Sequence, residues 1–162
     1  MNKKILSILT GFLIVAMFGI VFAATQQTTT ATATVNEFLS VTLTNVPVTF
    51  PAMDPGTTKN ASVGNGFPLT STIGNETNVN ANVTTKANQT SFGSPSGSFA
   101  VGNMSWSGSS SGSYTAYSNS TATVCSGKTA GQACDIFHRL SIPAAQLADT
   151  YNIGITISAL KA

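Results

Sequence analysis

The sequence predicts an all-β domain, an antiparallel β-sandwich or jelly roll, behind an N-terminal hydrophobic segment. Two stretches, Thr77–Lys86 and Tyr151–Ala159, alternate in the period of two that marks a strand with one buried face. After residue 23, no window of comparable length repeats apolar residues every 3.6 positions, as an amphipathic helix does. Seven or eight strands with turns at irregular spacing suit two packed antiparallel sheets.

Residues 1–23 resemble a signal peptide helix. Lys3 and Lys4 precede an apolar run, Ile5–Phe22, which ends at the small residue Ala23. This is the three-part pattern of a cleaved secretory signal, and we expect cleavage between Ala23 and Ala24. A retained anchor is the alternative, because the run is nearly long enough to span a bilayer. Cleavage predicts a secreted, extracellular protein whose only membrane contact is through the signal peptide.

Charge argues against one class of partner. Cleavage of residues 1–23 leaves 139 of the 162 residues, with five basic and five acidic side chains. Nucleic-acid binding needs a basic face that neutralises phosphates, so a formally neutral chain argues against it. Neutrality also removes the charge that keeps many secreted proteins soluble and monomeric, so either another solubilising layer or assembly is expected.

Thr28–Val35, with the sequence TTTATATV, predicts a strand at the mature N-terminus. Thr29, Ala31, Ala33 and Val35 share one face, and threonines fill the other. A strand here either closes its own domain as an edge or pairs with the sheet of another molecule. The predicted organisation is therefore a signal peptide at 1–23, an N-terminal strand segment at 24–36 and a β-sandwich domain at 37–162.

The remaining strands are predicted from alternation and from the turns between them. Asp54-Pro55-Gly56 is a turn, because proline presets φ and glycine accepts a positive φ. Residues 91–113 are rich in glycine and serine and are predicted to be mostly loop. Besides the two clearest segments, the predicted strands are Phe38–Thr44 with a short continuation at Val48–Phe50, Phe99–Trp106, Tyr114–Val124 and Asp135–Ile142.

The two cysteines, Cys125 and Cys134, enclose eight residues. In an exported protein, a pair this close predicts a disulfide across a turn, and no histidine or third cysteine stands at the spacing of a metal site.

Six Asn-x-Ser/Thr sequons predict N-linked glycans. None has proline at the middle position, and chance alone accounts for some of them in a chain so rich in Asn, Ser and Thr. A glycan coat would replace charge as the solubilising layer. The sequon asparagines are Asn60, Asn75, Asn82, Asn88, Asn103 and Asn119.

Catalytic chemistry has little support in this sequence. His138 is the only histidine, and its parity places it on the core-facing side of a strand, as expected of a structural residue. The acidic residues are scattered and form no paired or metal-ligating pattern, so neither an enzyme nor a zinc site is predicted, and no cofactor is expected. Calcium is the one metal left open, through Asp54 or Asp135 with loop oxygens.

Several segments together resemble archaeal secreted β-sandwich filament subunits, the bundling pilins and thread proteins related in fold to the biofilm fibre protein TasA. They are the secretion signal with its Thr/Ala strand, VTLTNVPVTFPAMDPGT, TNVNANVTTKA and RLSIPAAQLADTYNIGITISA. The phrase SIPAAQLADTY is similar to an IPxGxxAGTY ending of secreted sandwiches, with Ala145 and Asp149 where glycine is usual. The resemblance lies in strand order and turn style.

The resemblance implies donor-strand complementation, in which the N-terminal strand of one subunit completes the sheet of the next. It also implies a glycosylated, homopolymeric cell-surface filament for adhesion or biofilm formation. Thr29, Ala31, Ala33 and Val35 would then enter the neighbour. The alternative is a surface-layer or carbohydrate-binding adhesin, in which Trp106, Tyr114 and Tyr117 form an aromatic platform for sugars unless Trp106 is buried in the core.

Overall fold

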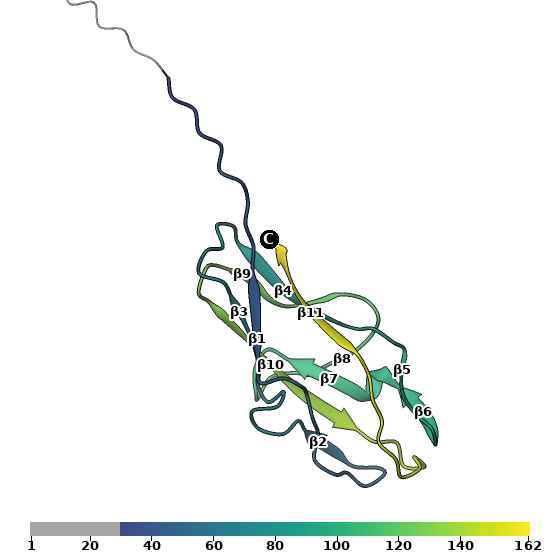
Figure 1. Cartoon of the computed structure of the whole chain (residues 1–162). Helices are drawn as coiled ribbons and strands as arrows, with labels where there is room; N and C mark the ends of the chain where they lie inside the picture. The colour runs from purple at the N-terminus through teal and green to yellow at the C-terminus, as the bar shows by residue number, and fades with distance from the viewer. Residues whose placement is uncertain (1–29) are drawn as a thin grey trace, which may run out of the picture. The chain divides into compact units, whose positions relative to one another are not determined.

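The computed structural model describes residues 30–162, and Asn36–Ala162 form a folded unit (Figure 1). The predicted signal peptide, its cleavage site at Ala23 and Ala24, and Thr28 and Thr29 lie outside the described residues. Residues 30–40 belong to no strand of their own chain, and the side chains of residues 30–38 are exposed. The predicted N-terminal strand therefore stays a prediction, because a strand that pairs with another molecule has no partner within one chain.

Eleven strands and one short 3-10 helix make up the secondary structure of residues 30–162, which confirms the all-β prediction. The described part of the chain contains no helix that is long and apolar enough to cross a membrane. The strands are β1 (Val41–Thr44), β2 (Thr58–Asn60), β3 (Leu69–Ile73), β4 (Ala81–Ala87), β5 (Ser91–Ser94), β6 (Gly97–Ala100), β7 (Met104–Ser107), β8 (Thr115–Ala116), β9 (Ala122–Lys128), β10 (Ala133–Ser141) and β11 (Ile155–Lys161).

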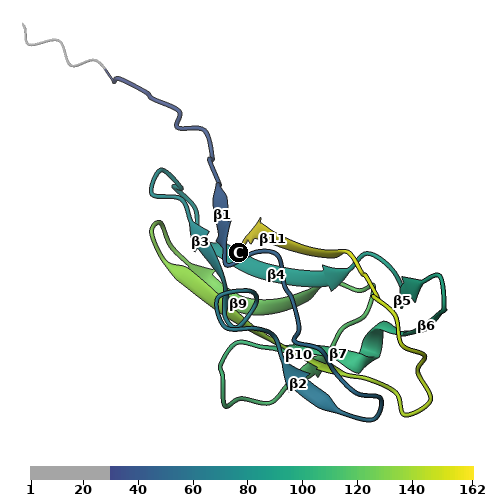
Figure 2. The same ribbon diagram turned by 60° about the horizontal axis from the view of Figure 1, so that its bottom comes forward.

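Two antiparallel sheets pack around one core, as in a β-sandwich (Figure 2). The larger sheet has the order β1-β3-β10-β7-β8, with β2 also paired to β10, and the smaller sheet has the order β11-β4-β9. A separate hairpin pairs β5 with β6. The strands β3 and β10 alternate most strictly between buried and more exposed residues, because each has neighbours on both sides and one face against the core.

The core lies between the sheets and follows the predicted alternation. On β10, Ile136, His138 and Leu140 are buried, as expected. On β4, Ala81, Val83, Thr85 and Ala87 point into the same core. Phe92 and Phe99 stack with their ring centroids 4.7 Å apart, so the β5-β6 hairpin contributes its own pair of aromatic side chains to the core.

The predicted strands that form differ in their bounds. β1 begins at Val41 where Phe38 was predicted, and β10 spans Ala133–Ser141 where Asp135–Ile142 was predicted. β4 and β11 each begin four residues after their predicted starts, at Ala81 and Ile155. Thr77, the predicted start of β4, lies in a turn that is held by the hydrogen bond from its N–H to the Gly74 carbonyl. The segment Phe99–Trp106 is divided by the 3-10 helix Val101–Asn103, and the segment Tyr114–Val124 is divided between β8 and β9.

Three regions of the structure were not predicted as strands. β2, β3 and the hairpin strand β5 were missed, although Leu69, Ser71 and Ile73 of β3 alternate and are all buried. In the opposite direction, Val48–Phe50 forms no strand. Its backbone pairs locally instead, with hydrogen bonds from the Thr49 N–H to Asn65 and from the Ser62 N–H to Thr49.

Candidate functional site

Strand β11 has one open edge. Within residues 30–162 it pairs only with β4, in an unbroken register of seven residue pairs from Ile155↔Ala87 to Lys161↔Ala81. Flanking hydrogen bonds, from the Asn88 N–H to Gly154 and from the Ala162 N–H to Asn80, fix which residues face β4. Because bonding direction alternates along an antiparallel strand, the even-numbered residues bond to β4 and the odd-numbered ones direct their N–H and C=O groups to the open edge.

The same odd-numbered residues carry the side chains that face the core. Ile155, Ile157 and Ala159 pack against buried residues, yet each remains half-buried. On β10, which has neighbours on both sides, the equivalent residues Ile136 and Leu140 are 0% and 6% exposed. Thus β11 lies in one of the two segments with the clearest alternation, yet its inward side chains are incompletely covered in the folded chain.

A groove of about 860 Å³ lies beside β11. One side is lined by Ile155 and Ile157 of β11 with residues 148–154, and the other by Leu43 of β1 with residues 46–53. The floor reaches buried core side chains, among them Leu69, Met104 and Leu140. Since apolar side chains stay open to solvent where a sandwich normally closes, the groove has the shape and chemistry of a site for an additional strand.

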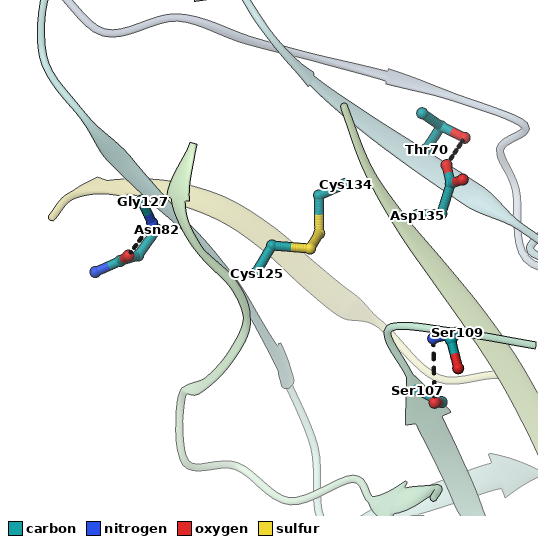
Figure 3. Close-up of a disulfide and its surroundings, with 8 residues drawn as sticks. All are labelled: Thr70, Asn82, Ser107, Ser109, Cys125, Gly127, Cys134 and Asp135. Carbon is teal, nitrogen blue, oxygen red and sulfur yellow. Dashed lines mark hydrogen bonds between the residues drawn. A yellow bond between two sulfur atoms is a disulfide. The ribbon is translucent and has the colours of Figure 1, made fainter. Parts of the chain in front are cut away.

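The other edges of the two sheets are less accessible to a strand. β8 has only two residues, and β1 has four before Asn45 adopts a positive φ of 60° and the chain turns away. At β9, Cys125 is bonded to Cys134 of β10, which ties this edge to the larger sheet (Figure 3). The register of β9 with β4 is also shifted at two places, and β9 ends at Lys128. Bulges and charged residues are features that block edge-to-edge pairing.

The disulfide confirms the predicted pairing of Cys125 with Cys134. The two Cα atoms are 6.1 Å apart, within the usual range, and the bond links the two sheets across the turn between β9 and β10. We predict that the double substitution Cys125→Ser/Cys134→Ser lowers the free energy of unfolding by about 2–3 kcal/mol, because the unfolded chain without the cross-link regains loop entropy. Urea denaturation of wild type and variant, at equal concentrations, measures the difference. Equal denaturation midpoints would contradict the prediction.

His138 is a structural residue of the core, as its parity predicted. Its side chain is 0% exposed and lies in a chain of hydrogen bonds that joins the two sheets. The Gly66 carbonyl is 3.0 Å from Nδ1, and the Tyr117 hydroxyl is 2.9 Å from Nε2. Because a carbonyl only accepts, Nδ1 carries the hydrogen, and Tyr117 donates to Nε2 while accepting from the Thr85 hydroxyl of β4 at 3.0 Å. Burial lowers the pKa of His138 to about 4.

The predicted glycan sites are spread over the surface, and none of the six sequon asparagines lines the groove beside β11. Asn60, Asn75, Asn88 and Asn119 are exposed, and Asn82 and Asn103 are half-buried. The side-chain oxygen Oδ1 of Asn82 accepts a hydrogen bond from the Gly127 N–H (Figure 3). This bond does not involve Nδ2, which is the atom that carries an N-glycan. At Asn103 it is Nδ2 that is engaged, by the Ala100 carbonyl at 3.1 Å.

The two calcium candidates do not converge. Asp135 accepts a hydrogen bond from the Thr70 hydroxyl on the neighbouring strand β3 (Figure 3), and the backbone carbonyl of Asp54 closes a turn with Thr57. Among residues 30–162, no group of three or more His, Cys, Asp or Glu side chains lies close enough to hold a metal ion.

The suggested aromatic platform for sugars is wrong. Trp106 and Tyr117 are 9% and 3% exposed, so their faces pack in the core and cannot stack on a sugar in solvent. Tyr114 is half-buried, and the guanidinium of Arg139 covers its ring at 3.8 Å from the centroid. The burial follows from the strand pairing, because β7 places Trp106 opposite His138 of β10.

Comparisons with protein-family models, with curated proteins and with solved structures found no match to this chain.

Proposed function

We propose that this protein is the structural subunit of an extracellular homopolymeric filament, in which the N-terminal strand of one copy fills the groove beside β11 of the next. The single observation that carries the proposal is the groove itself. It is lined by Ile155 and Ile157, which are half-buried and lie on a strand whose edge is open within residues 30–162. A second strand there would cover the apolar floor and bond to the main chain of a sheet edge, which is how strand addition gives affinity.

The occupant of the groove is a second copy of this chain. Thr28–Val35 has the alternation of a strand, and its eight residues would span about 26 Å, against about 23 Å for the seven residues of β11. Its alanines are small enough to enter between two packed sheets. Residues 30–35 are exposed and in no strand of their own chain, so they remain available to a neighbour.

The surface chemistry fits assembly. The sequons lie outside the groove, so glycans at these positions would leave the groove open. With a formally neutral mature chain, glycans would keep the outer faces of the filament hydrated. We predict that glycopeptide mass spectrometry of the native fibres finds glycans at the exposed Asn60, Asn75, Asn88 and Asn119 more often than at Asn103. Higher occupancy at Asn103 than at all four would contradict this.

Deletion of Ala24–Val35 tests the proposal. Full-length mature protein should form fibres in negative-stain electron micrographs, and the truncated protein should stay monomeric in size-exclusion chromatography, with the same β-rich circular dichroism spectrum. Replacement of the same residues by a Gly/Ser segment of equal length controls for chain length and should also stay monomeric. Fibres from either variant would overturn the donor role.

A further inference from the structure

The groove has two walls with main-chain groups, β1 and β11, and an inserted strand has two possible directions. We infer that the incoming strand pairs with β11, and that it runs antiparallel to β11. This inference rests on the proposed function and specifies the contact that the filament would repeat.

The choice of edge follows from the lengths of free backbone. On β11, Ile155, Ile157, Ala159 and Lys161 direct main-chain groups outward, and the strand contains no proline, no glycine and no charge before its last residue. On β1, only Val41 and Leu43 do so, because the hydrogen bond from the Gly74 N–H to Ser40 sets the same alternation there. Beyond β1, the wall continues as residues 46–53, where Pro47 and Pro51 cannot donate.

The direction follows from where the chain leaves the domain. Asn36 accepts a hydrogen bond from the side chain of Asn78, and Glu37 forms an ion pair with Lys161. The N-terminal segment of each subunit therefore departs beside the C-terminal end of β11, and in both views β1 lies next to this end (Figures 1 and 2).

A strand that ran parallel to β11 would bring the donor subunit to that same end, where the acceptor's own segment already departs. A strand that runs antiparallel to β11 places its Val35 end near Ile153, so the donor subunit sits at the opposite end of the groove. Each subunit then gives its strand at one end and receives one at the other. This head-to-tail contact does not close on itself and extends as a filament. Antiparallel pairing is also slightly more stable per residue.

Residue parity is consistent with this arrangement. In an antiparallel pair, directly opposite side chains share a face, so the inward residues of the donor oppose the inward residues of β11. In such a register, Ala33 lies opposite Ile155 or Ile157, and Thr29 lies toward Ala159 or Lys161. In either register, the small side chain of Ala33 thus meets a large isoleucine of the acceptor strand.

Cysteine pairs placed in single chains test the contact, because directly opposite residues in antiparallel strands have Cα atoms about 4.5–5.5 Å apart, within disulfide range. The antiparallel set pairs Ala33→Cys with Ile155→Cys or Ile157→Cys, and Thr29→Cys with Ala159→Cys or Lys161→Cys. The parallel set pairs Thr29→Cys with Ile155→Cys, and Ala33→Cys with Ala159→Cys. A third set pairs Ala33→Cys with Val41→Cys or Leu43→Cys on β1. All variants are assembled under mild oxidation and run on non-reducing gels.

We expect a covalent ladder of multimers from at least one Ala33 pair and one Thr29 pair of the antiparallel set, and monomer from the other sets. Ladders from the parallel set alone would overturn the direction, and ladders from the β1 set alone would overturn the choice of edge. In both cases the proposed function would stand. Fibres that form without residues 24–35 would instead refute the proposed function, so the two failures are distinguishable.

Discussion

Ile157→Asp abolishes fibre formation if the groove accepts a strand. Ile157 is half-buried on the inward face of β11 and lines the groove. In the single chain a carboxylate at this position keeps part of its contact with water, but an inserted strand would remove that water and leave an unpaired charge. Burial of an unpaired charge costs several kcal/mol, which is enough to prevent stable insertion. Electron microscopy and size-exclusion chromatography of the mature variant are the measurements.

The neighbouring residue supplies the matched control. Ser158 lies on the opposite face of β11 and does not line the groove, so Ser158→Asp introduces the same charge one residue away and should leave fibres intact. If Ser158→Asp abolished fibres as completely as Ile157→Asp, the effect would belong to strand stability and not to the groove.

A mixing experiment separates loss of the groove from loss of the fold. The Ile157→Asp variant keeps its donor segment, and the variant lacking residues 24–35 keeps its groove. Neither should polymerise alone, but together they should form a 1:1 dimer, because each supplies the half that the other lacks. Mass photometry or native mass spectrometry detects this species. A mixture that remains monomeric would count against strand exchange.

Acid should destabilise the isolated subunit through His138. The pKa of His138 is lowered to about 4 from 6.5, chiefly because burial penalises the charged ring. Between these two pH values the histidine of the unfolded chain binds a proton that the folded chain excludes. The free energy of unfolding is therefore highest above pH 6.5, as far as His138 is concerned, and falls as the pH drops toward 4. The shift corresponds to a loss of about 3 kcal/mol, a large share of the 5–15 kcal/mol typical of a domain.

The measurement is urea denaturation of the donor-deleted monomer at pH 7, 6, 5 and 4. His138→Gln removes the titrating group, so its stability should start lower and change less across this range. Asp149 titrates in a separate, more acidic pH range. Hydrogen bonds from Ser96 and the Thr150 N–H hold its pKa at about 2, so its protonation affects stability only below about pH 4. A wild-type profile that is flat from pH 6.5 to 4 would refute the role of His138.

The sequence predicted best the long strand β10, whose two neighbours enforce one buried face. β10 was located to within two residues, with Ile136, His138 and Leu140 inward, because a central strand must alternate. The disulfide was also predictable, since the sequence has two cysteines, nine residues apart, and each has no other cysteine to pair with in the chain. β3 and β5 were not predicted, because they are short and lie among turn residues. Four or five residues are too few for alternation to distinguish a strand from a loop.

The candidate site could be predicted only in part. Alternation in Tyr151–Ala159 identified the inward residues of β11, but it predicted a full core face where the structure has a half-buried one. The aromatic residues near the Gly/Ser loop suggested an exposed platform, with burial of Trp106 as the alternative. The structure buries Trp106, through the pairing of β7 with β10, and it also buries Tyr117. Periodicity gives the face of a strand, but it does not say whether a neighbour covers that face.

The sequence by itself determined the all-β class, the inward residues of the central strands and the cysteine pair, because these follow from local alternation and spacing. Only the tertiary structure decided that β1 and β11 flank an uncovered groove, that β9 is tied to the larger sheet and that His138 joins the sheets through Tyr117 and Thr85. The physical reason is that edges, grooves and buried polar networks are made by residues far apart in the chain. Their positions are set by how the sheets pair and pack.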